Sequence, residues 1–215
     1  MATNDEFGKL KEFIQKNLRA VGAIASIQRW NYISREGDIF CSGGCCGVNA
    51  AALDFVLQKG GYDVENVGTP YLNLETPFCT TDYHDHQFLV VHLGDEEVVT
   101  DSSYQQFLPH SLGNSGLSPF MVARYGDLRK ILGGIVDVVK QDPCPWDAFQ
   151  AFREEPKDLV IDHFMKIWDY KAPVENKDDG QFWKSKVDRS KIKCGYWPSQ
   201  SKLDYYLEHE FKLVH

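Results

Sequence analysis

The sequence lacks an excess of basic residues and has no long apolar run, and each absence excludes a class of protein. Lysine and arginine together number 23 against 31 aspartate and glutamate residues, which gives a formal net charge of −8. Proteins that bind nucleic acid through its phosphates need the opposite balance. No stretch reaches the roughly 20 consecutive apolar residues of a membrane-spanning helix. We therefore expect neither a nucleic-acid partner nor a membrane span.

Cysteine is also scarce. The chain has six cysteines in 215 residues, and three of them fall within residues 41–46. This distribution is too sparse and too uneven for a scaffold held together by disulfides. The first residues lack the basic-then-apolar order of a secretory signal. We expect reduced thiols and a chain made in the cytoplasm, although a bacterial effector delivered to a target cell without a cleaved signal peptide would have the same features.

The residues that are abundant are those of a folded protein. Hydrophobic residues make up 43% of the chain, aromatic residues 13% and charged residues 25%. A chain of this length can bury one sizeable core. We expect a single α+β domain, with its core in residues 1–140 and an aromatic-rich, mostly helical extension in residues 141–215 packed on that core.

Hydrophobic periodicity predicts the main elements of the core. Residues 7–18 have apolar side chains at helical spacing, which indicates an amphipathic helix. Residues 48–58 are mostly apolar and precede the glycine pair 60–61, so they predict a buried helix with a glycine C-cap. Residues 62–67 are typical of a short strand. Two β-branched runs within residues 86–101 flank a Gly-Asp turn and predict an antiparallel hairpin.

The remaining segments give weaker patterns. Residues 68–85 contain two prolines and predict a long irregular loop. Residues 117–134 indicate a mixed, mostly helical segment that ends at the second glycine pair, and residues 135–139 a short strand or helix after it. Beyond residue 142 the composition shifts toward aromatic and charged residues, which favours helices. No internal repeat or low-complexity tract is present.

A possible reactive centre lies at the start of the second predicted helix, where Cys45 and Cys46 precede the apolar run. A helix N-terminus stabilises a thiolate through its free N–H groups and its partial positive charge. A thiolate nucleophile also needs an imidazole to carry a proton and a carboxylate to orient that imidazole. His86 opens the predicted hairpin and Asp101 closes it, so a turn near Gly94 brings the two together. We expect a Cys-His-Asp site.

This arrangement resembles the papain-like and transglutaminase-like superfamily, in which a cysteine at the start of a helix faces a histidine and an aspartate on adjacent strands. The resemblance covers roughly residues 40–107. It selects Cys46 over Cys45 as the nucleophile. When Cys46 is aligned with the family's cysteine, the residues at the family's later pattern positions have the expected types: a small residue, an apolar residue, a glycine and a second apolar residue, which are Ala50, Leu57, Gly61 and Val67. It implies a papain/transglutaminase-like core with the nucleophile helix packed on an antiparallel sheet.

The stretches "HQFLVV" and "VVTDSSYQQF" resemble the histidine strand and the aspartate strand end of the same superfamily. The resemblance implies that Cys46 is the nucleophile, His86 the base and Asp101 the orienting carboxylate. Cys46 and His86 are 40 residues apart, and His86 and Asp101 are 15 apart. This compact spacing is similar to that of arylamine acetyltransferases and of the glutamine deamidase domains of bacterial toxins and effectors, including that of Pasteurella toxin.

The resemblance therefore implies an enzyme that attacks an amide carbonyl of a protein substrate through a thioester, without a metal or other cofactor. A glutamine deamidase or a transglutaminase-like enzyme is the leading hypothesis, and a papain-like cysteine peptidase is the alternative. Papain-like enzymes add a side-chain donor for the oxyanion upstream of the nucleophile. Gln28 is the candidate for that role in this chain.

Three other interpretations compete. Asp101 could instead cap a turn with Ser102 and Ser103. The aromatic C-terminal segment could belong to a non-catalytic interaction module. A zinc site could draw on Cys41, Cys45, Cys46, Cys79, His84 and His86, but these residues form no C-x-x-C pair, adjacent cysteines cannot easily share one tetrahedral ion, and Asp101 would have no role.

Overall fold

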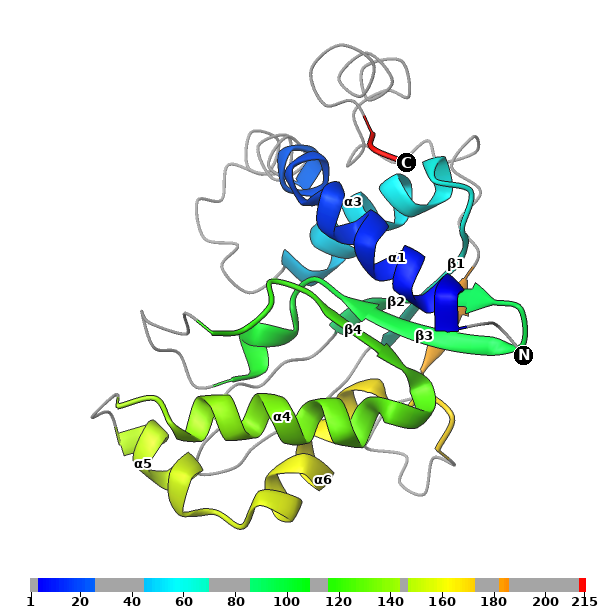
Figure 1. Cartoon of the computed structure of the whole chain (residues 1–215). Coiled ribbons are helices and arrows are strands. Elements are labelled where there is room, and N and C mark those ends of the chain that lie inside the picture. Colours follow the sequence, from blue (N-terminus) through cyan, green and yellow to red (C-terminus); the bar gives the residue numbers. More distant parts are fainter. Residues whose placement is uncertain are drawn as a thin grey trace, which may run out of the picture.

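The computed structural model describes residues 4–25, 45–69, 86–108, 116–143, 147–172, 182–185 and 213–215. Within these residues an antiparallel sheet lies between two layers of helices (Figure 1). The predicted α+β class is therefore confirmed. No helix in the described part of the chain is long and apolar enough to cross a membrane.

The sheet has five strands in the order β4-β3-β2-β1-β5, and every neighbouring pair is antiparallel. The strands are β1 (Asp63–Thr69), β2 (His86–Leu93), β3 (Glu96–Asp101), β4 (Met121–Arg124) and β5 (Trp183–Ser185). Two short 3₁₀ turns follow strands, η1 (Tyr104–Phe107) after β3 and η2 (Tyr125–Asp127) after β4. The predicted strand and hairpin are thus present, and β1 extends two residues beyond its predicted end.

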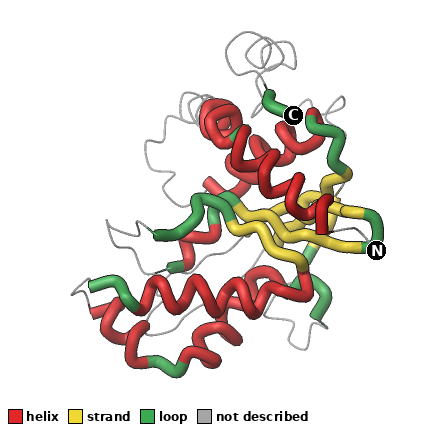
Figure 2. The backbone as a smooth tube through the Cα atoms, in the orientation of Figure 1, coloured by secondary structure: helices red, strands yellow, loops and turns green. Residues whose placement is uncertain are grey.

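One helical layer covers each face of the sheet, as Figure 2 shows. The first layer contains α1 (Asn4–Lys16) and α3 (Cys45–Lys59), and residues 18–25 are also helical. The second layer contains α4 (Leu128–Lys140), α5 (Asp147–Glu154) and α6 (Lys157–Trp168). Alternation along the strands divides the apolar side chains between the layers, because successive strand residues point to opposite faces. In β2, Leu89 and Val91 pack toward the first layer, whereas Phe88 and Val90 pack toward the second.

Helix α3 runs antiparallel to β1, and its length places its first residues at one end of the sheet. The 15 residues of α3 rise about 21 Å, and the seven residues of β1 span about 20 Å. The chain turns at Gly61, whose φ of 83° is easily reached only by glycine, as the sequence predicted. The start of α3 therefore lies at the end of the sheet where β1 and β3 end and β2 begins.

The start of α3 approaches the beginning of β2 closely at Gly47. A Cβ atom at Gly47 would lie 3.0 Å from the side-chain oxygen of Gln87, the second residue of β2. A larger residue at this position would therefore require the Gln87 side chain to move, and glycine avoids that contact.

The segment after the hairpin differs from its prediction in two ways. Residues Met121–Arg124 form the edge strand β4, with Met121 and Ala123 buried, where we expected mixed helix. The helix expected to end at the second glycine pair continues through it, so α4 runs from Leu128 to Lys140. Glycine costs a helix about 1 kcal/mol per residue. The buried apolar row of α4 outweighs that cost and consists of Leu128, Leu132, Ile135, Val136 and Val139.

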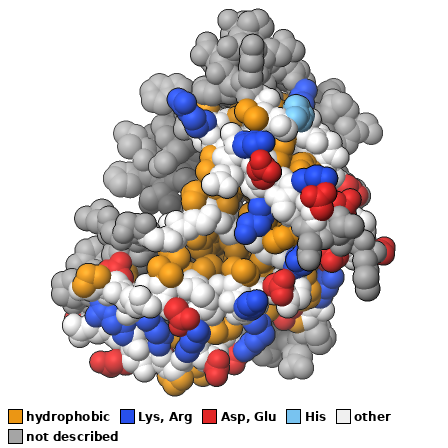
Figure 3. Space-filling view, in the orientation of Figure 1, with side chains coloured by type: hydrophobic (Ala, Val, Ile, Leu, Met, Phe, Trp, Pro, Cys, Tyr) orange, Lys and Arg blue, Asp and Glu red, His pale blue; other side chains and the backbone are white. Residues whose placement is uncertain are grey.

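A shallow apolar groove of about 330 Å³ runs between the two helical layers beside β4. Figure 3 shows hydrophobic side chains gathered in this hollow, between α1 and α4. Ile14 of α1 lines one side, Ile135 of α4 the other, and Met121 and Val122 form the floor. Both helical layers therefore reach the surface along the edge of the sheet.

Candidate active site

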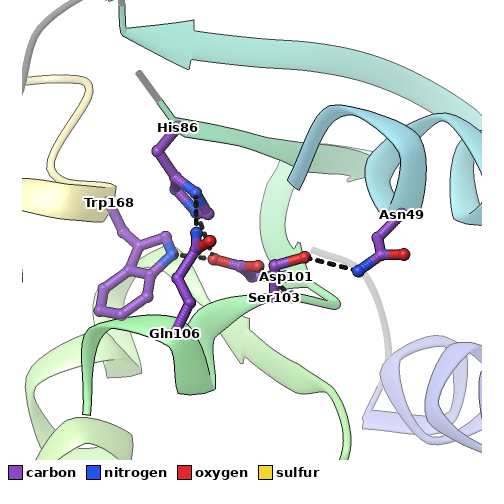
Figure 4. Close-up of polar contacts among 6 residues, drawn as sticks. All are labelled: Asn49, His86, Asp101, Ser103, Gln106 and Trp168. Atoms are coloured by element: carbon purple, nitrogen blue, oxygen red, sulfur yellow. Dashed lines mark hydrogen bonds and ion pairs between the residues drawn. The ribbon is translucent and has the colours of Figure 1, made fainter. Parts of the chain in front are cut away.

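The hairpin brings His86 and Asp101 into direct contact, as the sequence predicted. His86 is the first residue of β2 and Asp101 the last of β3, and Nε2 of the imidazole lies 2.7 Å from Oδ2 of the carboxylate. The two side chains are 0% and 1% exposed. An ionised carboxylate only accepts hydrogen bonds, so Nε2 carries the proton in this contact. The burial of both residues shields the pair from solvent, and Figure 4 shows side chains that contact it.

Cys46 is the second residue of α3, and its side chain is buried and only 4% exposed. The thiol is not part of a disulfide and lies close enough to His86 to help raise the pKa of its imidazole. The first four N–H groups of a helix have no partner within the helix. The N–H of Cys46 is one of these. An N–H group at this position of a helix can bind an acceptor beyond the helix N-terminus. The structure thus brings Cys46, His86 and Asp101 together.

The electrostatics of the site favour the charged form of the imidazole. Burial alone would lower the pKa of His86, because it removes the charged ring from water. The Asp101 carboxylate and the Cys46 thiol outweigh burial through charge and hydrogen bonding, and the pKa of His86 rises to about 9. At neutral pH the ring is therefore an imidazolium between two groups that can carry negative charge.

Asp101 uses its two carboxylate oxygens for two different purposes. Oδ1 accepts a hydrogen bond from the backbone N–H of Ser103 at 2.7 Å, which caps the turn after β3. Oδ2 accepts from His86 and also from the indole N–H of Trp168, again at 2.7 Å. The turn cap and the contact with histidine, which competed as interpretations of the sequence, are therefore both present in one side chain.

The second imidazole nitrogen meets Gln106 in the 3₁₀ turn η1. The side-chain nitrogen of Gln106 lies 2.8 Å from Nδ1 of His86, and in this arrangement the amide N–H donates and Nδ1 accepts. Turning the carboxamide over presents its oxygen to Nδ1–H instead, so Gln106 can serve the neutral ring and the imidazolium. Because Nε2 faces Asp101, a proton exchanged with Cys46 would pass through Nδ1, the nitrogen that Gln106 contacts in this structure.

A further hydrogen bond joins the helix that carries Cys46 to the turn that carries Asp101. Asn49 lies one helical turn after Cys46 in α3, and its side-chain amide donates to the hydroxyl of Ser103 at 3.0 Å. The N–H of Ser103 in turn binds Asp101. Asn49 and Ser103 therefore fix the start of α3 relative to the end of β3 (Figure 4).

Several residues that the sequence singled out lie outside the described residues. These are Gln28, Cys41, Cys79 and His84, and the side chain of Cys45 is likewise not described. The proposed oxyanion role of Gln28 therefore stays a prediction, as does the zinc alternative. In the described part of the chain, no three residues of the His, Cys, Asp and Glu types form a group that could hold a metal ion.

Sequence reasoning missed two residues whose side chains form hydrogen bonds with the His86–Asp101 pair. Gln106 falls within the stretch that carried the resemblance, five residues after Asp101, and a search for amide side chains near the predicted pair would have found it. Trp168 belongs to the predicted C-terminal extension and lies 67 residues from Asp101 in sequence. No local pattern marks it, because its contact depends on how α6 packs against the sheet.

Compared with family models, curated proteins and solved structures, the chain gives no match.

Proposed function

We propose that this chain is a cysteine-dependent amide hydrolase that forms a thioester on Cys46, and that it acts on glutamine side chains of a protein. The observation that supports the proposal most directly is the buried His86–Asp101 pair, next to which the Cys46 thiol at the start of α3 helps to raise the pKa of the imidazole. A thiol, an imidazole and an orienting carboxylate are the groups that nucleophilic acyl transfer requires.

The chemistry follows from the positions of these groups. In the imidazolium form of the site the proton of Cys46 is on Nδ1 of His86, and the thiolate sulfur attacks the amide carbonyl carbon. The oxygen becomes negatively charged and accepts hydrogen bonds from the N–H of Cys46 and from a side-chain donor, for which Gln28 is the candidate. The C–N bond then breaks, and the imidazolium gives its proton to the departing ammonia. A thioester on Cys46 remains.

Water completes the reaction. His86, again neutral, removes a proton from a water molecule that attacks the thioester carbon. The C–S bond breaks, the product is a carboxylic acid, and the thiol is regenerated with the proton from His86. Asp101 keeps the imidazole in the orientation that both half-reactions need. If an amine replaces water, the same intermediate gives transamidation, and if the scissile amide is a peptide bond, it gives proteolysis.

The choice of glutamine rests on the resemblance in spacing to toxin deamidase domains, and a product assay tests it. Incubation with a library of glutamine-containing peptides should release ammonia and leave intact chains that are heavier by about one dalton, whereas a peptidase would yield fragments. Cys46→Ala should abolish the reaction. The matched variant Cys45→Ala should keep most of it, and equal loss in both variants would contradict the assignment of Cys46.

A test without substrate separates the enzyme hypothesis from the zinc and interaction-module hypotheses. Iodoacetamide should alkylate Cys46 already near pH 6, well below the range of an ordinary thiol, because the imidazolium stabilises the thiolate. His86→Ala should remove this reactivity. Slow labelling of Cys46 that increases only above about pH 8 would contradict the proposed nucleophile.

A further inference from the structure

Trp168 lies against the carboxylate that orients the imidazole, and it comes from a distant part of the chain. It is the last residue of α6, and its side chain is 1% exposed. Its indole N–H donates to Oδ2 of Asp101 at 2.7 Å, the same oxygen that His86 contacts at 2.7 Å (Figure 4). Two donors therefore share one carboxylate oxygen.

Aromatic rings next to this contact pack against one another and against the imidazole. The Trp168 ring meets the ring of Phe107 nearly at right angles with centroids 6.2 Å apart, and Phe107 in turn meets the imidazole of His86 edge to face at 4.6 Å. These contacts fix the plane of the imidazole and keep water from the pair. A hydrogen bond to a charged group is strengthened where water is excluded.

Sharing one oxygen has two consequences for the imidazole. First, the carboxylate cannot rotate, because Ser103 holds Oδ1 and Trp168 holds Oδ2. Second, the positive end of the N–H dipole of Trp168 points at the oxygen that stabilises the imidazolium, and it reduces the negative charge available to that ring. Trp168 therefore influences both the direction of Nδ1 and the ease with which the ring releases its proton.

We propose that Trp168 is a positioning residue, whose N–H hydrogen bond to Asp101 aligns the imidazole of His86 with Cys46 and weakens its hold on the proton that the reaction must transfer. The kinetic part of this inference rests on the proposed function. The titration part does not, because it concerns only the His86–Asp101 pair and the neighbouring Cys46 thiol, the ionisable groups that shift the pKa of His86.

The test removes the indole N–H of Trp168 while keeping the shape of the side chain. In one variant β-(3-benzothienyl)alanine takes the place of Trp168, so that sulfur replaces the indole N–H, and in a second variant Trp168 becomes Phe. NMR titration of ¹⁵N-labelled histidine follows His86 in each. We expect the pKa of His86 to rise by about one unit in the isosteric variant. An unchanged or lower pKa in that variant would overturn the inference.

Kinetics on the glutamine peptide library provide the second measurement. Both variants should lower kcat by about tenfold with little change in KM, because the tighter imidazolium is a poorer proton donor to ammonia. Phe164→Leu serves as the control for lost packing, since Phe164 is buried in α6 and packs against Phe152. An equal loss of kcat in this control would mean that Trp168 acts through packing alone and would overturn the inference.

The two proposals can fail separately. If wild-type protein turns over no glutamine peptide but the pKa of His86 still rises in the isosteric variant, the proposed substrate is wrong and the role of Trp168 in the pair stands. If turnover is present and depends on Cys46, but neither Trp168 variant shifts His86, the proposed function stands and the role of Trp168 is wrong.

Discussion

The face of the sheet under α1 and α3 is packed almost entirely with aliphatic side chains, whereas the face under α4, α5 and α6 combines aliphatic side chains with most of the buried aromatic ones. The first cluster includes Leu10, Leu53, Val56, Leu57, Leu89 and Val91. The second includes Phe88, Phe107, Phe149, Phe152, Phe164 and Trp168. The buried His86–Asp101 pair lies on the aromatic side.

This difference shows how a buried charge is accommodated. Aliphatic side chains offer only dispersion contacts, and a carboxylate among them would lack donors. An aromatic layer offers ring edges with partial positive charge and, in tryptophan, an N–H group. Trp168 supplies that donor to Asp101, and Phe107 packs against His86. The aliphatic layer contributes stability and carries Cys46 to the end of the sheet.

The largest expected effect comes from breaking the pair on the aromatic side. Asp101→Asn should lower kcat by about 10³- to 10⁴-fold, because an amide nitrogen facing Nε2 forces the wrong tautomer of His86. The melting temperature should also fall, because the amide nitrogen offers no acceptor to the indole N–H of Trp168, whereas the amide oxygen can still accept from Ser103 and cap the turn. Thermal unfolding and peptide turnover measure the two effects. Loss of activity that follows loss of folded protein would indicate a purely structural aspartate.

A substitution on the aliphatic side should lower the stability of the fold and leave kcat unchanged. Leu53 is fully buried in α3. Leu53→Ala should therefore lower the free energy of unfolding by about 2–5 kcal/mol through lost burial and a cavity. In urea denaturation this appears as a lower midpoint. Below the unfolding transition, kcat and the NMR titration of His86 should match the wild type. A shifted titration would mean that the aliphatic layer also tunes the pair.

The third prediction concerns the pH dependence of stability, to which the aromatic side of the sheet contributes through His86. The pKa of His86 is raised to about 9 in the folded chain, against about 6.5 when unfolded. Its contribution to stability is therefore fully present below pH 6.5 and is lost as pH rises toward 9, by a total on the order of 3 kcal/mol. Urea midpoints between about pH 6 and pH 9.5 measure the decline. His86→Gln should flatten it, and an equally steep decline in that variant would assign it to other groups.

Gln106→Ala should have the smallest of these effects. The Gln106 amide contacts Nδ1 of His86 at 2.8 Å, and losing this one hydrogen bond should lower kcat by about tenfold. The adjacent Gln105 is the matched control, because it lies in the same turn at similar burial and its side chain binds the carbonyl of Ser118 rather than His86. Gln105→Ala should therefore leave kcat near that of the wild type. Similar losses in both variants would point to damage to the 3₁₀ turn rather than a lost donor.

The parts of the fold that could be predicted from the sequence depend on local pairing and periodicity. The β2–β3 hairpin and the meeting of His86 with Asp101 follow from a turn between two β-branched runs. The buried helix α3 and its glycine C-cap follow from an apolar run and the glycine pair. Each of these features joins residues that are close in sequence.

The features that could not be predicted depend on distant contacts. The continuation of α4 through Gly133 is stabilised by packing against α6, where a Cβ at this position would meet Ile161 at 3.6 Å. The edge strand β4 exists because β3 offers it a partner, not because of its own four residues. The contact of Trp168 with Asp101 requires α6 to dock on the sheet. Tertiary packing outweighed local propensity in each case.

The order in which these contacts close has a kinetic consequence. His86 and Asp101 are 15 residues apart, whereas Trp168 lies 67 residues from Asp101. Closing the longer loop costs about 1.3 kcal/mol more chain entropy than closing the shorter one, and hairpins form within microseconds. The imidazole and the carboxylate therefore meet early in folding while still in water. Docking of α6 then removes the pair from water, so a partly folded chain holds the two charges together without the buried environment that strengthens their interaction.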